Sequence, residues 1–165
     1  ERKPERFEKP MNDERKEGVR ESVLDYPEKP RVEASPVHVE IFFNNILVAD
    51  SSEVKRVVEK GMPPVYYVPA EDVEMKYLTK SGKTYRCKWK GEAAYYNIRV
   101  HDKEAANAAW SYEDPNPGYG DIVGYLAFYS EPMQACYVDG ELITRHPKHG
   151  GGWIIPGIED VPGGG

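Results

Sequence analysis

The stretch Thr84-Tyr-Arg-Cys-Lys-Trp-Lys-Gly-Glu-Ala-Ala-Tyr-Tyr96 decides the fold that the sequence predicts. Its residues alternate between two faces, as in a β-strand, until Lys90-Gly91, where we expect the chain to turn into a second strand. The first strand should present an apolar face carrying Tyr85, Cys87 and Trp89. The opposite, cationic face should carry Thr84, Arg86, Lys88 and Lys90. Two alternating strands joined by a short turn predict an antiparallel hairpin.

Similar strands and turns are expected along most of the remaining chain. Alternation predicts strands at 37–43, 46–49, 65–68 and 122–129, and a hairpin formed by 133–138 and 141–144. Asn44-Asn45 and Asp139-Gly140 suit two-residue turns with positive φ. The valine-rich segment 54–59 has helical spacing behind a capping box at 50–53, although a strand stays open there. Helix and strand are equally open at 104–112. A mainly β, mainly antiparallel fold with one or two short helices follows.

Composition limits the classes of function. The chain has 165 residues, a net charge of −6 and only two cysteines. The acidic balance argues against nucleic-acid binding, and no apolar run approaches the about 20 residues that cross a membrane. The charged start, Glu1-Arg-Lys-Pro4, shows no signal peptide. Two cysteines are too few for a disulfide framework, so we expect a reduced, cytoplasmic protein.

We expect three regions along the chain. Residues 1–36 form a charged, extended or partly disordered arm, with a short helix open at 13–24 and a docking segment at 23–27. Residues 37–145 form the β-domain. Residues 146–165 form a tail rich in glycine and proline, which docks on the domain through Trp153, Ile154 and Ile155.

Six motifs in this order resemble the DUF427 family, also called NTP_transf_9. They are Pro63–Pro69, Glu71–Val73, Cys87–Gly91, Ala94–Tyr96, Asn107–Tyr112 and Ala127–Tyr129. The resemblance covers about residues 31–144, and the tail at Gly150–Ile155 is similar to that of extended members. It implies a compact antiparallel domain similar to the β-tent folds, which carry small-ligand pockets in other families. It implies no known activity. Lys88 and Asn44-Asn45 depart from the residues common in the family and indicate local adjustment.

The sequence contains little that indicates a metal site or nucleotidyl transfer. Many β-tent proteins hold zinc through paired Cys-x-x-Cys knuckles, whereas Cys87 and Cys136 stand alone, so we expect no metal and no other cofactor. Nucleotidyl transfer needs a phosphate cradle and clustered carboxylates, and no such glycine-rich motif occurs. Asp72 is expected to N-cap a turn of helix.

The aromatic residues are the strongest functional signal, with twelve tyrosines and three tryptophans in the chain. We expect a small molecule to bind in an aromatic pocket, because this many phenol groups need polar partners when buried. The predicted ligand-binding residues are Tyr67, Trp89, Lys90, Tyr95, Tyr96, Trp110 and Tyr112.

Two alternative functions stay open. One is a small enzyme using Cys87, Lys90 or Asp72 in acid-base or covalent catalysis, since neighbouring cations lower a thiol pKa. The strand pattern nevertheless favours a structural role for Cys87, packed beside Tyr85 and Trp89. The other is a protein-interaction module that uses the arm and the tail, with a homodimer left open.

Overall fold

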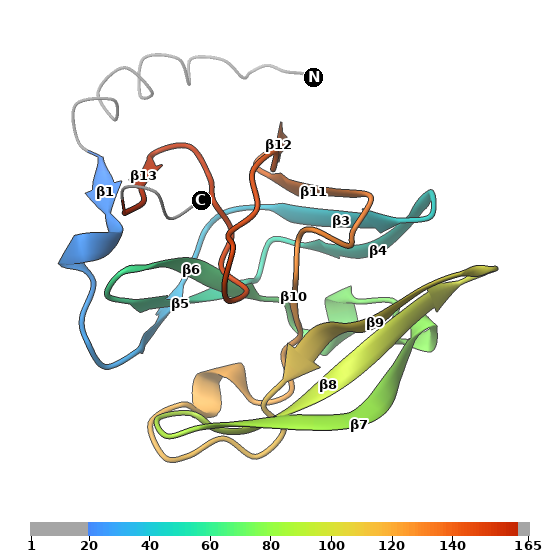
Figure 1. The fold of residues 1–165 in the computed structure, drawn as a ribbon, viewed down its shortest axis with the longest axis horizontal. Coiled ribbons are helices and arrows are strands. Elements are labelled where there is room, and N and C mark those ends of the chain that lie inside the picture. Colours follow the sequence, from blue (N-terminus) through green and yellow to red (C-terminus); the bar gives the residue numbers. More distant parts are fainter. Residues whose placement is uncertain (1–19, 162–165) are drawn as a thin grey trace.

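The structure is a computed structural model that describes residues 20–161. Strands dominate it, and the described helices are single 3₁₀ turns. Three sheets are antiparallel, and one short parallel pair joins the two ends of the described chain (Figure 1). The mainly β, antiparallel fold is therefore confirmed. Within residues 20–161, no helix is long and apolar enough to cross a membrane.

The largest sheet contains the stretch that decides the fold. Its strands, in spatial order, are β10 (Ala127–Phe128), β9 (Lys103–Ser111), β8 (Gly91–Val100) and β7 (Leu78–Cys87). Cys87 pairs with Gly91, which confirms the predicted hairpin. The turn itself lies at 88–90 and not at Lys90-Gly91, because Gly91 is already the first residue of β8. The segment that left helix and strand open is β9. It is a strand because it pairs along its length with β8 and because β10 covers its other edge.

The second sheet consists of hairpins whose turns follow local sequence. Its order is β12 (Glu141–Leu142), β11 (Ala135–Val138), β3 (Val39–Phe43) and β4 (Ile46–Ser51). Asn44 and Asn45 have φ of 47° and 69°, and Asp139 and Gly140 have φ of 51° and 82°. Positive φ at both central residues is the requirement of the predicted two-residue turns, and both hairpins are confirmed.

The third sheet corrects two predictions. Its strands are β2 (Arg31–Ala34), β5 (Lys55–Glu59) and β6 (Met62–Tyr67), in that order. The helix predicted at 54–59 is wrong and the strand alternative is right, because β5 lies between two partner strands. Pro63 and Pro64 were expected to precede a strand and instead lie within β6. An edge strand tolerates proline because one side of it needs no ladder hydrogen bonds.

The chain ends meet in the fourth sheet, where β1 (Glu21–Ser22) pairs with β13 (Ile158–Glu159). Residues 1–19 and 162–165, which include most of the helix predicted at 13–24, lie outside the described residues. The 3₁₀ turns are η1 (Val23–Asp25), η2 (Ala70–Asp72), η3 (Met75–Tyr77) and η4 (Gly120–Ile122).

The strand predicted at 122–129 is correct only for β10. Residues 119–125 form successive turns, in which the Ile122 amide donates to the Tyr119 carbonyl and the Tyr125 amide donates to the Ile122 carbonyl. Gly124 has a φ of 76°, which ends any regular strand there. Alternation in this segment therefore reflected burial of separate turn residues.

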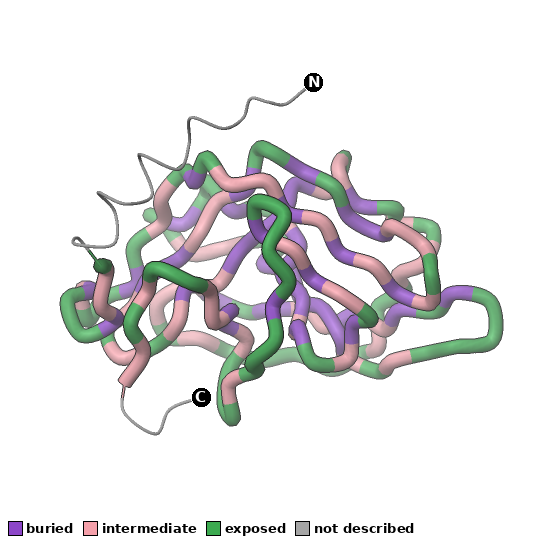
Figure 2. The backbone as a smooth tube through the Cα atoms, turned by 90° about the horizontal axis from the view of Figure 1, so that it is seen from above, coloured by how far each residue is buried: buried purple, intermediate pink, exposed green. Residues whose placement is uncertain are grey.

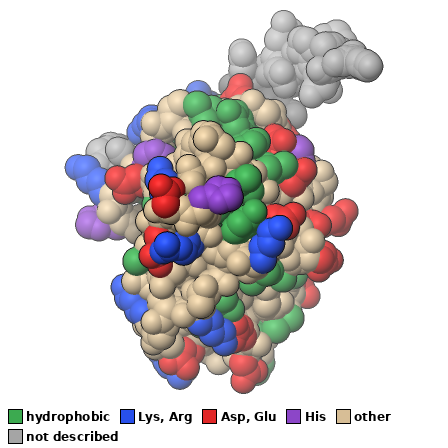
Figure 3. Space-filling model, turned by 90° about the vertical axis from the view of Figure 1, so that its right-hand side faces the viewer, with side chains coloured by type: hydrophobic (Ala, Val, Ile, Leu, Met, Phe, Trp, Pro, Cys, Tyr) green, Lys and Arg blue, Asp and Glu red, His purple; other side chains and the backbone are tan. Residues whose placement is uncertain are grey.

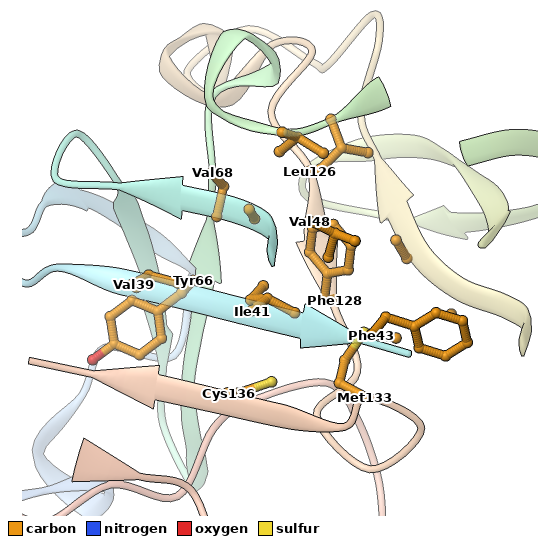
Figure 4. Packing of buried hydrophobic residues seen from close by; sticks show 14 of the residues in the cluster. Val39, Ile41, Phe43, Val48, Tyr66, Val68, Leu126, Phe128, Met133 and Cys136 are labelled. Carbon is orange, nitrogen blue, oxygen red and sulfur yellow. The ribbon is translucent and has the colours of Figure 1, made fainter. Parts of the chain in front are cut away.

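The main core lies between the second sheet and the sheet of β7–β10. Val39, Ile41 and Phe43 project from β3 toward residues that include Val48 and Phe128 (Figure 4). Buried residues run through the middle of the molecule, and its turns are exposed (Figure 2). A separate cluster of buried aromatic side chains forms next to β6, β8 and β9.

Candidate functional site

The separate aromatic cluster is centred on Trp110 of β9. The indole Nε1–H of Trp110 donates to the hydroxyl of Tyr67, at 3.3 Å, and the two rings meet edge to face with centroids 6.4 Å apart. Tyr67 and Tyr112 are buried and their rings also touch. Burial raises the pKa of Tyr67 well above its usual range, so its phenol stays neutral at physiological pH.

The outer side of the cluster is formed by two half-buried tyrosines. The Tyr129 ring lies 4.7 Å from the Trp110 ring, and the Tyr95 ring lies 6.5 Å from it, between ring centroids. The hydroxyls of Tyr95 and Tyr129 are 3.4 Å apart. Burial, followed by the hydrogen bond to Tyr95, raises the pKa of Tyr129 above its usual range. Tyr129 is thus a neutral aromatic surface supported from behind by Trp110.

Lys90 does not lie on the face predicted for it. Its Nζ is 3.5 Å from Cys87 Sγ and 5.6 Å from the centroid of the Tyr112 ring. The side chain reaches the cysteine face because the strand ends at Cys87, so alternation no longer applies three residues later. Tyr85, expected on the apolar face, is 56% exposed, because nothing covers that part of β7. The predicted face is therefore wrong for Lys90, whereas Tyr85 differs from the prediction only in being uncovered.

The thiol of Cys87 lies beside a cation, and the described residues form no hydrogen bond that joins it to a general base. Its thiol accepts from the backbone N–H of Lys90, at 3.4 Å, and is half-buried. No hydrogen bond within residues 20–161 joins Cys87 to a histidine or a carboxylate. Trp89 next to it is half-buried, and the ammonium groups of Lys29 and Lys88 lie 5.6 and 4.9 Å from its ring centroid.

Two other predicted residues lie apart from this cluster. Tyr96 packs in the main core, and its hydroxyl donates to Glu113 at 2.5 Å. Burial and that hydrogen bond raise its pKa to about 12. Asp72 is the last residue of η2, and Glu74, not Asp72, is the N-cap of the following turn η3, which corrects the capping prediction. Its carboxylate accepts from the hydroxyl of Ser51, at 2.6 Å, and so ties η2 to β4.

The C-terminal tail crosses the aromatic cluster as a strap, Gly150–Gly152. A Cβ on Gly151 would lie 2.0 Å from Cη2 of Trp110, and a Cβ on Gly152 would lie 2.2 Å from the Pro63 carbonyl oxygen. Trp153 anchors the strap: its ring is 1% exposed, its Nε1–H donates to the Phe128 carbonyl, and its amide donates to the Pro64 carbonyl, both at 2.9 Å. Glycine is needed because the strap backbone passes directly over the indole ring.

A cleft of about 370 Å³ opens between the strap and the loop that follows β10. It is lined by Ala106, Asn107, Tyr129, Ser130, Glu131, Pro132, His146, Pro147, Lys148, Gly150, Gly151 and Gly152. None of the seven predicted ligand-binding residues is among them, although Trp110 lies directly beneath Gly151 and beside Tyr129. No sequence pattern indicated the cleft, because its two walls lie far apart along the chain.

Asn107 occupies an irregular position in the cleft wall. Its φ is 52°, and the pairing of β8 with β9 shifts register between Tyr96 and Ile98, opposite this residue. Its amide N–H donates to the side-chain oxygen of Asn97, at 2.7 Å. Its own Oδ1 is buried and has no hydrogen-bond partner. A β-bulge re-aims a side chain in this way, and bulges are over-represented next to binding sites.

Three side chains at the edge of the second sheet are close enough to share a metal ion. The ligand atoms of His38, Glu40 and Asp50 lie within 4.8 Å of one another. His38 Nε2 already pairs with Asp50 Oδ1 at 2.6 Å, and both side chains are well exposed. This pair explains why His38 and Asp50 lie close together, and neither cysteine belongs to the group.

The family model described as NTP_transf_9, a domain of unknown function (DUF427), matches residues 31–139. The chain belongs to the DUF427 family. No curated protein matches the chain. The matched segment of this DUF427 domain contains Asn107, Tyr129 and Ser130, whereas His146 and the strap lie beyond it. The cleft is therefore shared between the family domain and the tail that follows it.

Proposed function

We propose that this DUF427 protein binds a small organic molecule in the cleft between the strap and the loop after β10. One observation carries the proposal: the side-chain oxygen of Asn107 is buried in the cleft wall without a hydrogen-bond partner. Native proteins pair nearly all their buried polar atoms, so an unpaired one at a cleft indicates a site for a donor from outside the chain.

The energetic cost of holding Asn107 in this conformation supports the proposal. A buried polar atom without a partner costs about 1–3 kcal/mol. The left-handed backbone of Asn107 adds a further cost, which asparagine bears more easily than most residues. Costs of this kind persist where the site uses them. A ligand N–H or O–H that donates to Asn107 Oδ1 would recover the first of them.

The other walls of the cleft define the chemistry of the ligand. Tyr129 offers a half-buried ring, supported by Trp110 at 4.7 Å, and Pro132 and Pro147 extend the apolar surface. Glu131 and Lys148 add one charge of each sign. We therefore propose a ligand with a flat or apolar part and at least one hydrogen-bond donor. In this proposal Trp110 and Tyr95 act by holding Tyr129 in place.

The same proposal covers partners and location. Acidic and basic side chains are intermingled on the face that carries the β3–β4 and β8–β9 turns, with no broad basic area in that view (Figure 3). This distribution and the net charge of −6 support a protein that does not take nucleic acid as a partner. The two free cysteines support a reducing, cytoplasmic location. Self-association remains a prediction, which sedimentation velocity of the full chain would test.

The proposal is tested by ligand screening of the full chain. Native mass spectrometry identifies small molecules that copurify, and a fragment library is then screened by thermal shift. The key variant is Asn107→Gly, because glycine adopts a φ of 52° without strain and keeps the backbone N–H while losing the side-chain oxygen. Binding should weaken by about tenfold or more, since roughly 1.4 kcal/mol corresponds to a factor of ten.

Asn45→Gly is the matched control. Asn45 also has a positive φ, 69°, but lies in the β3–β4 turn away from the cleft. This variant should bind as the unchanged protein does. Compounds that bind equally well to Asn107→Gly would place the ligand elsewhere, and a library without a single binder would remove the proposal.

A further inference from the structure

The cleft contains a serine and a histidine in direct contact. Ser130 Oγ and His146 Nδ1 are 2.7 Å apart, although the two residues are 16 positions apart in sequence. Both line the cleft. Ser130 is 6% exposed and lies just after β10, whereas His146 is exposed on the tail. A separation of about 2.6–3.2 Å is what a general base needs to take the proton of a serine nucleophile.

Tail anchoring does not require this contact. The tail is held by Trp153, whose buried ring and two hydrogen bonds fix the chain seven residues after His146. Ser130 is held independently, because its carbonyl accepts from the Met133 amide in a turn, at 3.1 Å. Ser130 and the tail that carries His146 are thus held by separate contacts, and the two side chains meet in the wall of the cleft.

The strap supplies donors at the same place. Among the hydrogen bonds of the described residues, none has the backbone N–H of Gly150, Gly151 or Gly152 as its donor. All three glycines line the cleft with Ser130. Backbone N–H groups that are free of other partners are the usual means of stabilising the oxyanion formed when a serine attacks an acyl group.

We infer that Ser130 is the nucleophile, and His146 the general base, of an esterase site that hydrolyses small carboxylic esters. The Ser130 oxygen attacks the acyl carbon while its proton passes to His146 Nδ1. The bond to the leaving alcohol then breaks, and that oxygen takes the proton from the imidazolium. Water attacks the acyl-serine with His146 again as base, which releases the carboxylic acid and restores the Ser130 hydroxyl. The net reaction is ester plus water to acid plus alcohol.

The proposed ligand site then becomes the substrate site, and the inference rests on that function. The Tyr129 ring would carry the apolar part of the ester, and Asn107 Oδ1 would accept from a donor on it. The neutral imidazole accepts the serine proton at Nδ1 when its own proton is on Nε2.

The test uses a fluorophosphonate probe, which phosphonylates activated serines, on the full chain. Intact-mass measurement counts the adducts, and peptide mapping locates them. We expect one adduct, on Ser130, and none in Ser130→Ala. His146→Gln retains a side-chain oxygen that can accept the serine hydrogen bond but cannot act as a base, so labelling should slow at least tenfold. His149→Ala, at the neighbouring exposed histidine, should label at the unchanged rate.

Each outcome separates this inference from the binding proposal. The esterase inference is overturned if the folded protein leaves Ser130 unlabelled. It is also overturned if His146→Gln is labelled as fast as the unchanged protein. If the probe fails to label Ser130 in the unchanged protein but Ser130→Ala still binds a ligand in the thermal-shift assay, the binding function stands and the esterase inference does not. Labelling of Ser130 that no cleft ligand slows would support the nucleophile and contradict the ligand site.

Discussion

The glycine at position 151 offers a sharp test of how the tail closes over the aromatic cluster. The substitution Gly151→Ala adds one methyl group, and its carbon would lie 2.0, 2.8 and 2.9 Å from three atoms of the Trp110 ring. Carbon atoms in ordinary contact lie about 3.5–4.0 Å apart. The strap and the ring must therefore separate by about 1.5 Å, or the strap must leave the ring.

Neither partner can move freely, and this sets the magnitude. The Trp110 ring is held by Tyr67 and Tyr129, and the strap is fixed by the buried Trp153 two residues later. Overpacking of this kind costs about 1–3 kcal/mol. For a chain of this size, each kcal/mol lowers the Tm by about 2–4 °C. We therefore expect a Tm lowered by several degrees and a changed tryptophan fluorescence.

The measurement is urea unfolding followed by tryptophan fluorescence. Gly120→Ala is the control, because Gly120 has no atom within 4 Å of the added carbon and no left-handed φ, so its stability should hold or rise slightly. The substitution Trp110→Phe removes the ring atom that would collide with the added methyl group. The double variant with Gly151→Ala and Trp110→Phe should therefore lose less stability than the sum of the losses of the two single variants. If Gly151→Ala is as stable as Gly120→Ala, the strap does not lie on Trp110.

Three further predictions follow from the contacts described above. Trp153→Ala should lose about 3–5 kcal/mol of stability in urea unfolding, because the buried ring anchors the tail; a loss below about 1 kcal/mol would show that the tail is not docked. Arg56 donates two hydrogen bonds to Glu21 and lowers its pKa, so this pair stabilises the fold at neutral pH and its contribution disappears as the pH falls below about 4.5 through the lowered pKa. Arg56→Met should be less stable at pH 7 and should show a shallower loss of stability on acidification, whereas parallel pH profiles would contradict this account. Burial raises the pKa of Cys136 to about 12, so a thiol reagent at pH 8 should react with Cys87 alone in the folded protein and with both cysteines in urea; two fast thiols in the folded state would contradict the burial.

A change in the strap should also reach the cleft. Gly150–Gly152 form one wall of it, and the opposite wall belongs to the segment that the DUF427 family model matches. Displacement of the strap by Gly151→Ala would therefore weaken the binding of any ligand in the cleft, although Asn107 and Tyr129 are unchanged. Binding and stability measured on the same variant would connect tail docking to function.

The sequence determined the features that depend on neighbouring residues. Asn44-Asn45 and Asp139-Gly140 specify tight turns because few other residues accept positive φ, and alternation specifies strands because side chains on a strand change face at every residue. The hairpin of β7 and β8 and the antiparallel character of the fold followed from these local rules, although the turn lies at 88–90 and Gly91 already belongs to β8. The six ordered motifs likewise identified the family.

Tertiary structure decided everything that depends on contacts between distant segments. The choice between helix and strand at 54–59 depended on the partner strands on both sides of β5. The position of the Lys90 side chain depended on the end of β7 at Cys87, three residues earlier. The cleft exists because Trp153 docks the tail, which brings His146 to Ser130 and the strap over Trp110. The local pattern of a segment does not encode which distant segment it packs against, so these residues could not be predicted from local patterns.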